Sequence, residues 1–254
     1  MLAPLRDYFC PKEPLSSPLL YTTKEHYFCR LSVTIDPGRP GFEEAQWITS
    51  EDVNVEHLLD VFTSIDASSV DVWAVCDNFM DYLYRHKPRL VKLGPKIEGL
   101  PDDHPSKPKC LFRLSLLFGT VGNHVERKRL LMHALILWRG RGDDYETAET
   151  LRLISRANWM LGLYKEGIQQ AKDALGIYEQ LNNVVGQALS LQQLASLLCN
   201  DNQLDTAEEA HHAQSISWPK ATNLRSAIVT VSSARYVTPR ARQRRPSITS
   251  RRRS

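Results

Sequence analysis

Apolar residues recur at helical spacing in two stretches before residue 90. The first begins after the polar run Thr49–Asp52, a plausible capped start, and ends at the polar residues 66–69. The second extends from Val70 to Leu83 and should end near Pro88. Residues 90–108 contain six Gly or Pro residues and are typical of a linker. We therefore predict a helical pair and a linker over residues 49–104.

Proline is dense at the start of the chain. Residues 1–48 contain six prolines, which exclude any long helix. We interpret this segment as an irregular remnant of a preceding domain.

After residue 105 the chain repeats itself. A shift of 40 residues aligns Leu111 with Leu151 and Leu191, and Gly122 with Gly162 and Asn202. Glycine and asparagine are the residues that most often end a helix in a left-handed conformation. The pattern predicts three helix-turn-helix units over residues 105–217, stacked as a short all-α solenoid.

The second unit carries the clearest motif. Its segment LGLYKEGIQQAKDALGIYEQL resembles the second half of a tetratricopeptide (TPR) unit, with Gly162 in the turn and small residues at Gly167, Ala171 and Ala174. These alanines should lie where two helices touch. HEAT-type repeats share the period of 40, whereas the usual TPR period is 34, but the spacing of small residues favours TPR. Arg127, His211 and Gln214 depart from the pattern.

A broader resemblance covers Met1 to about Ser217. The segments MLAPLRDY, QWITSEDVNVEHLLDVFTSID, VGNHVERKRLL and RGDDYETAETLRLIS resemble the region that follows the nucleotide-binding module in fungal NACHT/NB-ARC-type signal-transducing NTPases, or STAND proteins. In that family an NTPase module drives oligomerisation and the helical repeats sense a ligand. The resemblance implies that this chain is the sensor side without the NTPase module.

Overall composition fits a soluble cytoplasmic protein. The 254 residues are 42% hydrophobic and 24% charged, and the five cysteines include no C-x-x-C pair. No apolar run approaches the roughly 20 residues of a membrane span. The net charge of +3 hides a strong asymmetry, because residues 220–254 hold ten of the 32 basic residues and no acid. The remainder has 22 basic against 29 acidic residues.

Motifs for catalysis are missing. The sequence lacks a P-loop, G-x-G-x-x-G, G-x-S-x-G and H-E-x-x-H, so we expect no enzymatic activity, no nucleotide binding and no cofactor. His26 with Cys29 and His211 with His212 have no partner pair at a zinc spacing, which favours ordinary packed or solvated side chains. The acidic pairs at 102–103 and 143–144 lie beside turns and are better explained as helix caps.

Candidate partner-binding residues lie on the first helix of the second unit. Glu149, Arg152, Arg156 and Trp159 share the helix face that lines the concave groove in TPR arrays, and Gln192 is the counterpart of Arg152 one unit later. A protein or peptide ligand is the expected partner. The alternative, a solvated helix face without a ligand, stays open. Trp138 is expected in the core.

The C-terminal segment 218–254 is rich in arginine and should be disordered. Such a tail suits nucleic acid, anionic lipid or an import receptor. A third interpretation is a frameshift product, because a one-base shift of the reading frame can yield another TPR-like unit in place of the tail.

The leading hypothesis is a non-catalytic interaction scaffold, and the alternative is a nucleic-acid-binding or nuclear-targeted protein acting through the tail. The third unit should end near Ser217, before Trp218 and Pro219. Without a capping repeat, the last unit should leave apolar residues poorly covered and open to self-association. These residues are Leu191, Leu194, Leu197 and Leu198.

Overall fold

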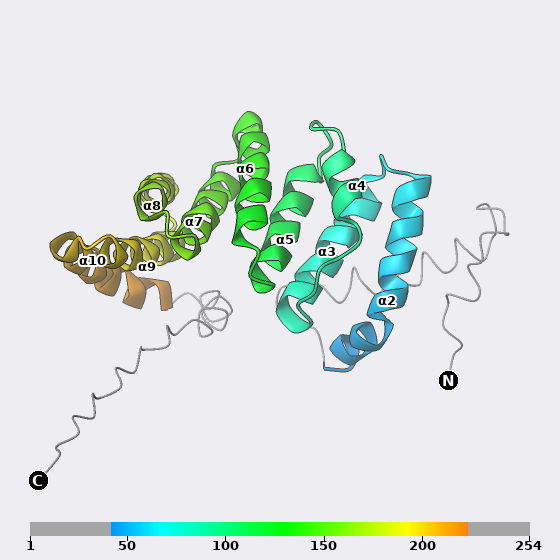
Figure 1. The fold of residues 1–254 in the computed structure, drawn as a ribbon, viewed down its shortest axis with the longest axis horizontal. Helices are drawn as coiled ribbons and strands as arrows, with labels where there is room; N and C mark the ends of the chain where they lie inside the picture. The colour runs from blue at the N-terminus through cyan, green and yellow to red at the C-terminus, as the bar shows by residue number, and fades with distance from the viewer. Residues whose placement is uncertain (1–41, 223–254) are drawn as a thin grey trace, which may run out of the picture.

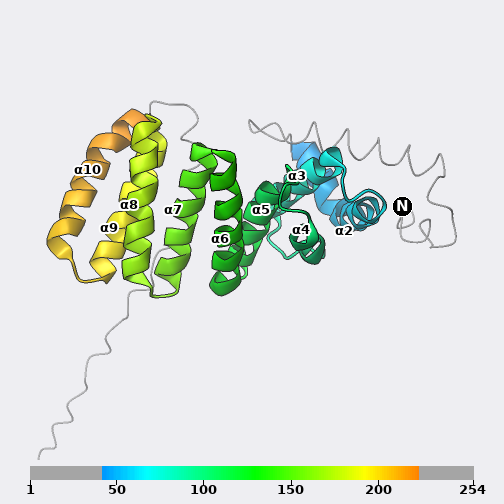
Figure 2. The ribbon, with the colours of Figure 1, turned by 90° about the horizontal axis from the view of Figure 1, so that it is seen from above.

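A computed structural model describes residues 42–222, and every regular element in that range is a helix. The helices are α2 (Phe42–Ile65), α3 (Val70–His86), α4 (Gly94–Gly99), α5 (Lys107–Thr120), α6 (His124–Arg141), α7 (Asp144–Met160), α8 (Tyr164–Gln180), α9 (Val184–Asn200) and α10 (Leu204–Thr222). From α5 onward each helix packs beside the one before it, so the array extends in chain order (Figures 1 and 2). The predicted all-α solenoid is confirmed, with units α5–α6, α7–α8 and α9–α10.

The turns between these helices share one backbone feature. Five residues at regular intervals have positive φ angles between 52° and 81°: Gly122, Gly142, Gly162, Asn182 and Asn202. Glycine adopts this conformation without steric cost, and asparagine tolerates it better than most residues. The repeat alignment predicted three of these positions. The structure adds Gly142 and Asn182, so a residue with positive φ follows each helix from α5 to α9, both within and between the units.

Side-chain caps begin several of the helices directly after these turn residues. The side-chain oxygens of Asn123, Asp143 and Asn183 accept hydrogen bonds from backbone N–H groups three residues later, at 3.1, 3.1 and 2.9 Å. Each cap satisfies a donor that would otherwise lack a partner at the helix start. The predicted capping role of the acidic pair at 143–144 is thus confirmed for Asp143.

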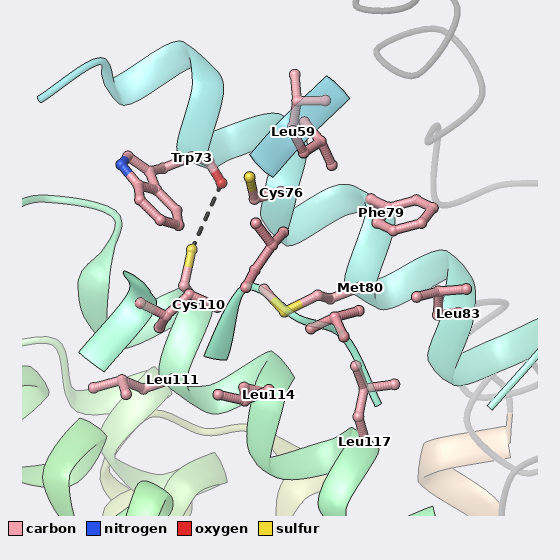
Figure 3. Close-up of a cluster of buried hydrophobic side chains, with 14 of the residues drawn as sticks. Leu59, Trp73, Cys76, Phe79, Met80, Leu83, Cys110, Leu111, Leu114 and Leu117 are labelled. Atoms are coloured by element: carbon pink, nitrogen blue, oxygen red, sulfur yellow. Dashed lines mark hydrogen bonds between the residues drawn. The ribbon is translucent and has the colours of Figure 1, made fainter. Parts of the chain in front are cut away.

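The largest apolar cluster joins α2, α3 and α5 (Figure 3). Leu59, Phe79 and Leu114 are three of its buried members, one from each helix. The Cys110 thiol donates to the Trp73 carbonyl at 3.6 Å, and the Trp73 indole Nε1 donates to the Ala67 carbonyl at 2.8 Å. The helical pair therefore forms one core with the first repeat unit, and the predicted core residue Trp138 of α6 belongs to the same cluster.

Two smaller clusters continue the core along the array. Ala174 lies in the cluster that joins α5 to α8, and Ala171 lies in the cluster that extends to α10. Both alanines are fully buried, as expected for residues at helix contacts. Small side chains let neighbouring helices approach closely there.

Two expectations about the N-terminal helices are wrong. First, α2 begins at Phe42 and passes through Thr49–Asp52, because the helix-forming residues after Gly41 continue the helix without interruption. Second, residues 90–108 are not an open linker. Pro95 lies in the first turn of α4, a position that a proline favours, and Leu93 and Ile97 are fully buried in the main cluster.

The end of the array also differs from expectation. Helix α10 continues through Trp218 and Pro219 to Thr222, although a proline at that position cannot donate a backbone hydrogen bond. The four leucines expected to be poorly covered are buried instead, with exposed fractions of 9%, 7%, 0% and 4% for Leu191, Leu194, Leu197 and Leu198. Residues of α10, among them Ala207 and Ala210, cover three of them.

Several predictions concern residues outside the described range. They are the irregular segment up to residue 41, and the disorder and frameshift of the tail beyond Thr222. Within residues 42–222, no helix is both long enough and apolar enough to cross a bilayer.

Candidate partner-binding face

The predicted partner-binding residues of α7 begin with a rigid ion pair. Arg152 Nε donates to Glu149 Oε2 at 2.9 Å, and Arg152 Nη2 also pairs with Glu149 Oε1. The Tyr178 hydroxyl on α8 donates to the same Glu149 Oε2 at 2.8 Å. A two-point Arg–carboxylate contact fixes both side chains in one geometry. Glu149 and Arg152 are therefore engaged with each other and with α8.

Burial and charge act in opposite directions on this pair. Burial alone would raise the pKa of Glu149, but the Arg152 guanidinium holds that pKa below its ordinary value. Burial alone would lower the pKa of Arg152, and the Glu149 carboxylate raises it instead. Both groups stay ionised at neutral pH and neutralise each other.

Tyr178 connects three helices. It is almost fully buried, and a Cβ atom at Gly186 of α9 would lie only 2.4 Å from its Cδ1. The absence of a side chain at Gly186 lets α9 approach the tyrosine ring this closely. Through its hydroxyl the same residue reaches Glu149 on α7. Tyr178 thereby holds the predicted face of α7 in place against α9.

Arg156 has no such partner. It is half-buried, and it forms no ion pair and no side-chain hydrogen bond with any residue that the structure describes. Burial is the main cause that lowers the pKa of Arg156; the neighbouring Tyr84 acts in the opposite direction, and the charge of Arg152 lowers that pKa further. Arg156 is therefore a cation held near the surface without a counter-ion.

The two remaining predicted residues differ in exposure. Trp159 is half-buried and packs against the cluster that joins α8, α9 and α10. Gln192 is exposed on α9, which packs directly against α7. The structure thus couples Glu149, Arg152 and Arg156 electrostatically, whereas the described contacts do not join the Gln192 side chain to them.

Arg127 of α6 belongs to the same neighbourhood and was not predicted. It is only 7% exposed, and its Nε is buried without a hydrogen-bond partner. Burial and then the charge of Arg156 lower the pKa of Arg127 to about 10. Within residues 42–222 no carboxylate pairs with it, in contrast to most buried arginines.

Gly119 of α5 makes the room for Arg127. A Cβ atom at Gly119 would lie 2.8 Å from Arg127 Nη1 and 3.0 Å from its Cδ. The guanidinium therefore lies against bare backbone near the end of α5. A larger residue at position 119 would displace the arginine from this place.

His124, in the first turn of α6, is the third cation-forming group here. Its Nδ1 is buried without a partner, while the residue as a whole is half-buried. Burial lowers the pKa of His124, and the charges of Arg127 and Arg156 lower it further. We call Arg127, Arg156 and His124 the unpaired cluster.

The sequence holds one signal for the unpaired cluster. In the repeat alignment, Arg127 stands where the later units have Gly167 and Ala207. A long cation at a position for small residues departs from the repeat. Its connection with Gly119 and Arg156 emerges only from the packing of α5, α6 and α7.

No metal site accompanies these residues. Among the described residues, no group of three or more His, Cys, Asp or Glu side chains could hold a metal ion. His211 and His212 are exposed on α10, and His26 with Cys29 lies outside the described range.

Comparisons with known proteins identify the fold. No protein-family model matches the chain, and no curated protein matches it. A crystal structure of the nearly identical TPR-like repeats of a putative kinesin light chain from Podosopora anserina has a TM-score of 0.51, with 15% identity over 72% of this chain and 94% of its own. A point variant of that protein gives 0.52, with 14% identity over 71% and 94%. At this identity the likeness shows TPR-like helical repeats, and it does not show an origin among NACHT/NB-ARC proteins.

Proposed function

We propose that the chain is a non-catalytic protein-interaction scaffold whose α7 face binds a peptide segment of a partner protein. The observation that carries this proposal is Arg156, a half-buried cation without a counter-ion on the predicted face. Free arginines beside an aromatic residue are typical of binding surfaces, since both residue types are enriched at the centres of interfaces. TPR-like arrays offer extended surfaces of this kind.

Each residue of the face has a role in this proposal. Arg156 supplies unoccupied N–H donors, and the half-buried Trp159 supplies apolar surface one turn further along α7. The Glu149–Arg152 pair keeps the helix face rigid, which lowers the entropy cost of binding. Gln192, exposed on the adjacent α9, can bond to the backbone of an extended peptide.

A peptide-display selection on the full chain tests the proposal. Selected peptides should bind Arg156→Gln and Trp159→Ala at least about tenfold more weakly than the natural protein. The matched control is Arg139→Gln, which removes the same charge from an exposed position on α6. Equal affinity of every selected peptide for all four proteins would refute binding at this face.

The absence of catalysis has its own test. We expect neither binding nor hydrolysis of ATP or GTP, because the motifs that cradle phosphates in NTPases are missing from the sequence. Isothermal titration with each nucleotide checks this expectation. A stoichiometric isotherm with micromolar affinity would contradict it.

The sequence resemblance supports a finer proposal, that this region is the sensor side of a NACHT/NB-ARC-type protein in a cytoplasmic signalling system. Transcript sequencing across the locus tests it. An in-frame NTPase module upstream, or its remnant, would support the proposal. A transcript whose extended reading frame encodes an unrelated module would refute it.

The ten basic residues in 220–254 favour the alternative function, nucleic-acid binding through the tail. The test is binding to mixed-sequence DNA at two salt concentrations. Salt-dependent binding that disappears on deletion of residues 220–254 would support the alternative, and equal binding of the shortened chain would exclude it.

A further inference from the structure

Charge in the unpaired cluster is not balanced by the surrounding residues. Arg127 and Arg156 carry two positive charges in a largely buried setting. The carboxylate that acts on Arg127, Glu149, is already occupied by Arg152 and the Tyr178 hydroxyl. Taking a guanidinium out of water without an acid is costly, so the folded protein holds two charges that a suitable anion would neutralise.

We propose that Arg127, Arg156 and His124 form a binding site for a doubly charged oxyanion, namely a phosphoryl group on the peptide bound at the α7 face. This inference rests on the proposed function and adds the chemistry of the ligand. Arg127 supplies a buried guanidinium whose Nε lacks a partner, and His124 supplies a buried Nδ1 that also lacks one. Arg156 and His124 are half-buried, so an anion can approach them from solvent.

The number of charges favours a phosphoryl group over a carboxylate. One carboxylate would neutralise only one of the two arginines, whereas a phosphoryl group carries about −1.5 to −2 at neutral pH. Its three oxygens can accept bonds from both guanidinium groups, whose planar forks match phosphate geometry. The site also lies at the first turn of α6, where the helix dipole favours an anion, although the His124 and Glu126 N–H groups already donate to Gly122 and Asn123.

Arg113 supplies the internal comparison. It extends from α5, donates a hydrogen bond to Asp77 at 3.0 Å and forms an ion pair with Asp81 at 2.7 Å. Two carboxylates thus surround that guanidinium, while two guanidinium groups in the unpaired cluster share none. The missing negative charges are what the ligand would supply.

Inorganic phosphate is the first probe. We would titrate the full chain with sodium phosphate at pH 7.5 and constant ionic strength, and follow the melting temperature and the binding heat. The expected result is saturable stabilisation that chloride and acetate do not reproduce. Arg156→Gln and Arg127→Gln should weaken it about tenfold or more, and Arg139→Gln should not.

Arg156→Gln keeps this test decisive if Arg127→Gln fails to fold, because Arg156 is only half-buried. Stabilisation that does not saturate, or that is equal in the natural protein and Arg156→Gln, would show an adventitious effect of salt and overturn the proposal.

Phosphorylated peptides distinguish the source of the phosphoryl group. Peptides from the display selection would be synthesised with serine or phosphoserine at each position in turn. Phosphorylation at one position should raise affinity about tenfold or more for the natural protein and not for Arg156→Gln. Saturable phosphate binding without a peptide that gains from phosphoserine would overturn the peptide part, leaving a free-phosphate site. Peptides that need Trp159 but ignore phosphate and phosphoserine would overturn this inference and leave the proposed function intact.

Discussion

Arg113 and Arg127 are two arginines largely removed from solvent that lie in opposite electrostatic settings. Arg113 forms ion pairs with Asp77 and Asp81 of α3, and Asp77 also pairs with Lys109 at 3.0 Å. Arg127 lies against Gly119 with a buried Nε that has no partner. Both guanidinium groups are thus largely shielded from solvent, and they differ in that, among the described residues, only Arg113 has carboxylates paired with it. We therefore expect the first arginine to stabilise the contact of α3 with α5 and the second to cost folding free energy.

The largest expected effect tests the paired side of this comparison. Arg113→Met would leave Asp81 without its cross-helix partner and Asp77 with Lys109 alone. Removing one member of a buried ion pair leaves an uncompensated charge, so the free energy of unfolding should fall by about 3 kcal/mol. Urea denaturation measures it. A loss below about 0.5 kcal/mol, the size expected of an ordinary surface substitution, would mean that these ion pairs do little for stability.

Arg127→Met tests the unpaired side, and its effect should have the opposite sign. Methionine fills a similar volume without a charge, and no carboxylate within residues 42–222 loses a partner. The free energy of unfolding should rise by about 1 kcal/mol in phosphate-free buffer. The same denaturation experiment applies. A loss of about 2 kcal/mol or more, as when a satisfied buried charge is removed, would show that the folded protein already satisfies this guanidinium.

A double-mutant cycle sharpens the comparison further. If Arg127 and Arg156 repel each other, replacing either by methionine relieves the same repulsion, so the two gains should not add. We expect a shortfall of about 0.5 kcal/mol in the double variant. Additive gains would indicate that the free-energy cost of these two charges comes from their burial and not from their mutual repulsion.

The smallest effect concerns pH. The pKa of His124 is lowered in the folded protein, so the unfolded chain binds a proton more readily there. Stability should therefore fall as the pH drops through the ordinary histidine pKa of about 6.5. Melting temperatures at pH 7.5 and 5.5 check this for the natural protein and His124→Gln. On going from pH 7.5 to 5.5 the variant should lose less stability than the natural protein. An equal loss in both proteins would argue against a lowered pKa of His124.

The sequence predicts the array well where local signals decide the structure. Gly122, Gly162 and Asn202 mark three turns because a positive φ strongly limits the residue type. Val70 correctly marks the start of α3, where Ser69 caps the helix by accepting a hydrogen bond from the Val72 N–H. Signals of this kind act within a few residues, so they can be read without knowledge of the packing.

Features that depend on distant contacts could not be predicted. Leu93 and Ile97 are too few to form a periodic pattern, and their burial follows from the contact of α4 with α5. The departure of Arg127 from the repeat is visible in the sequence, but the room that Gly119 leaves for it is not. The charge interactions of Arg156 with Arg127 and His124 of α6 join two helices, and the predicted face of Glu149 to Trp159 did not include the two α6 residues.

The regular spacing of the turn residues from Gly122 to Asn202 has a consequence for how such a chain can change length. One inserted residue turns all later side chains of its helix by about 100°, which carries the apolar stripe off its neighbour. An inserted single helix with its turn would restore that phase but reverse the direction of every later helix. Inserting a complete helix pair preserves both phase and direction. Natural variants of this array are therefore expected to differ by whole pairs of helices, with shorter insertions confined to the turns.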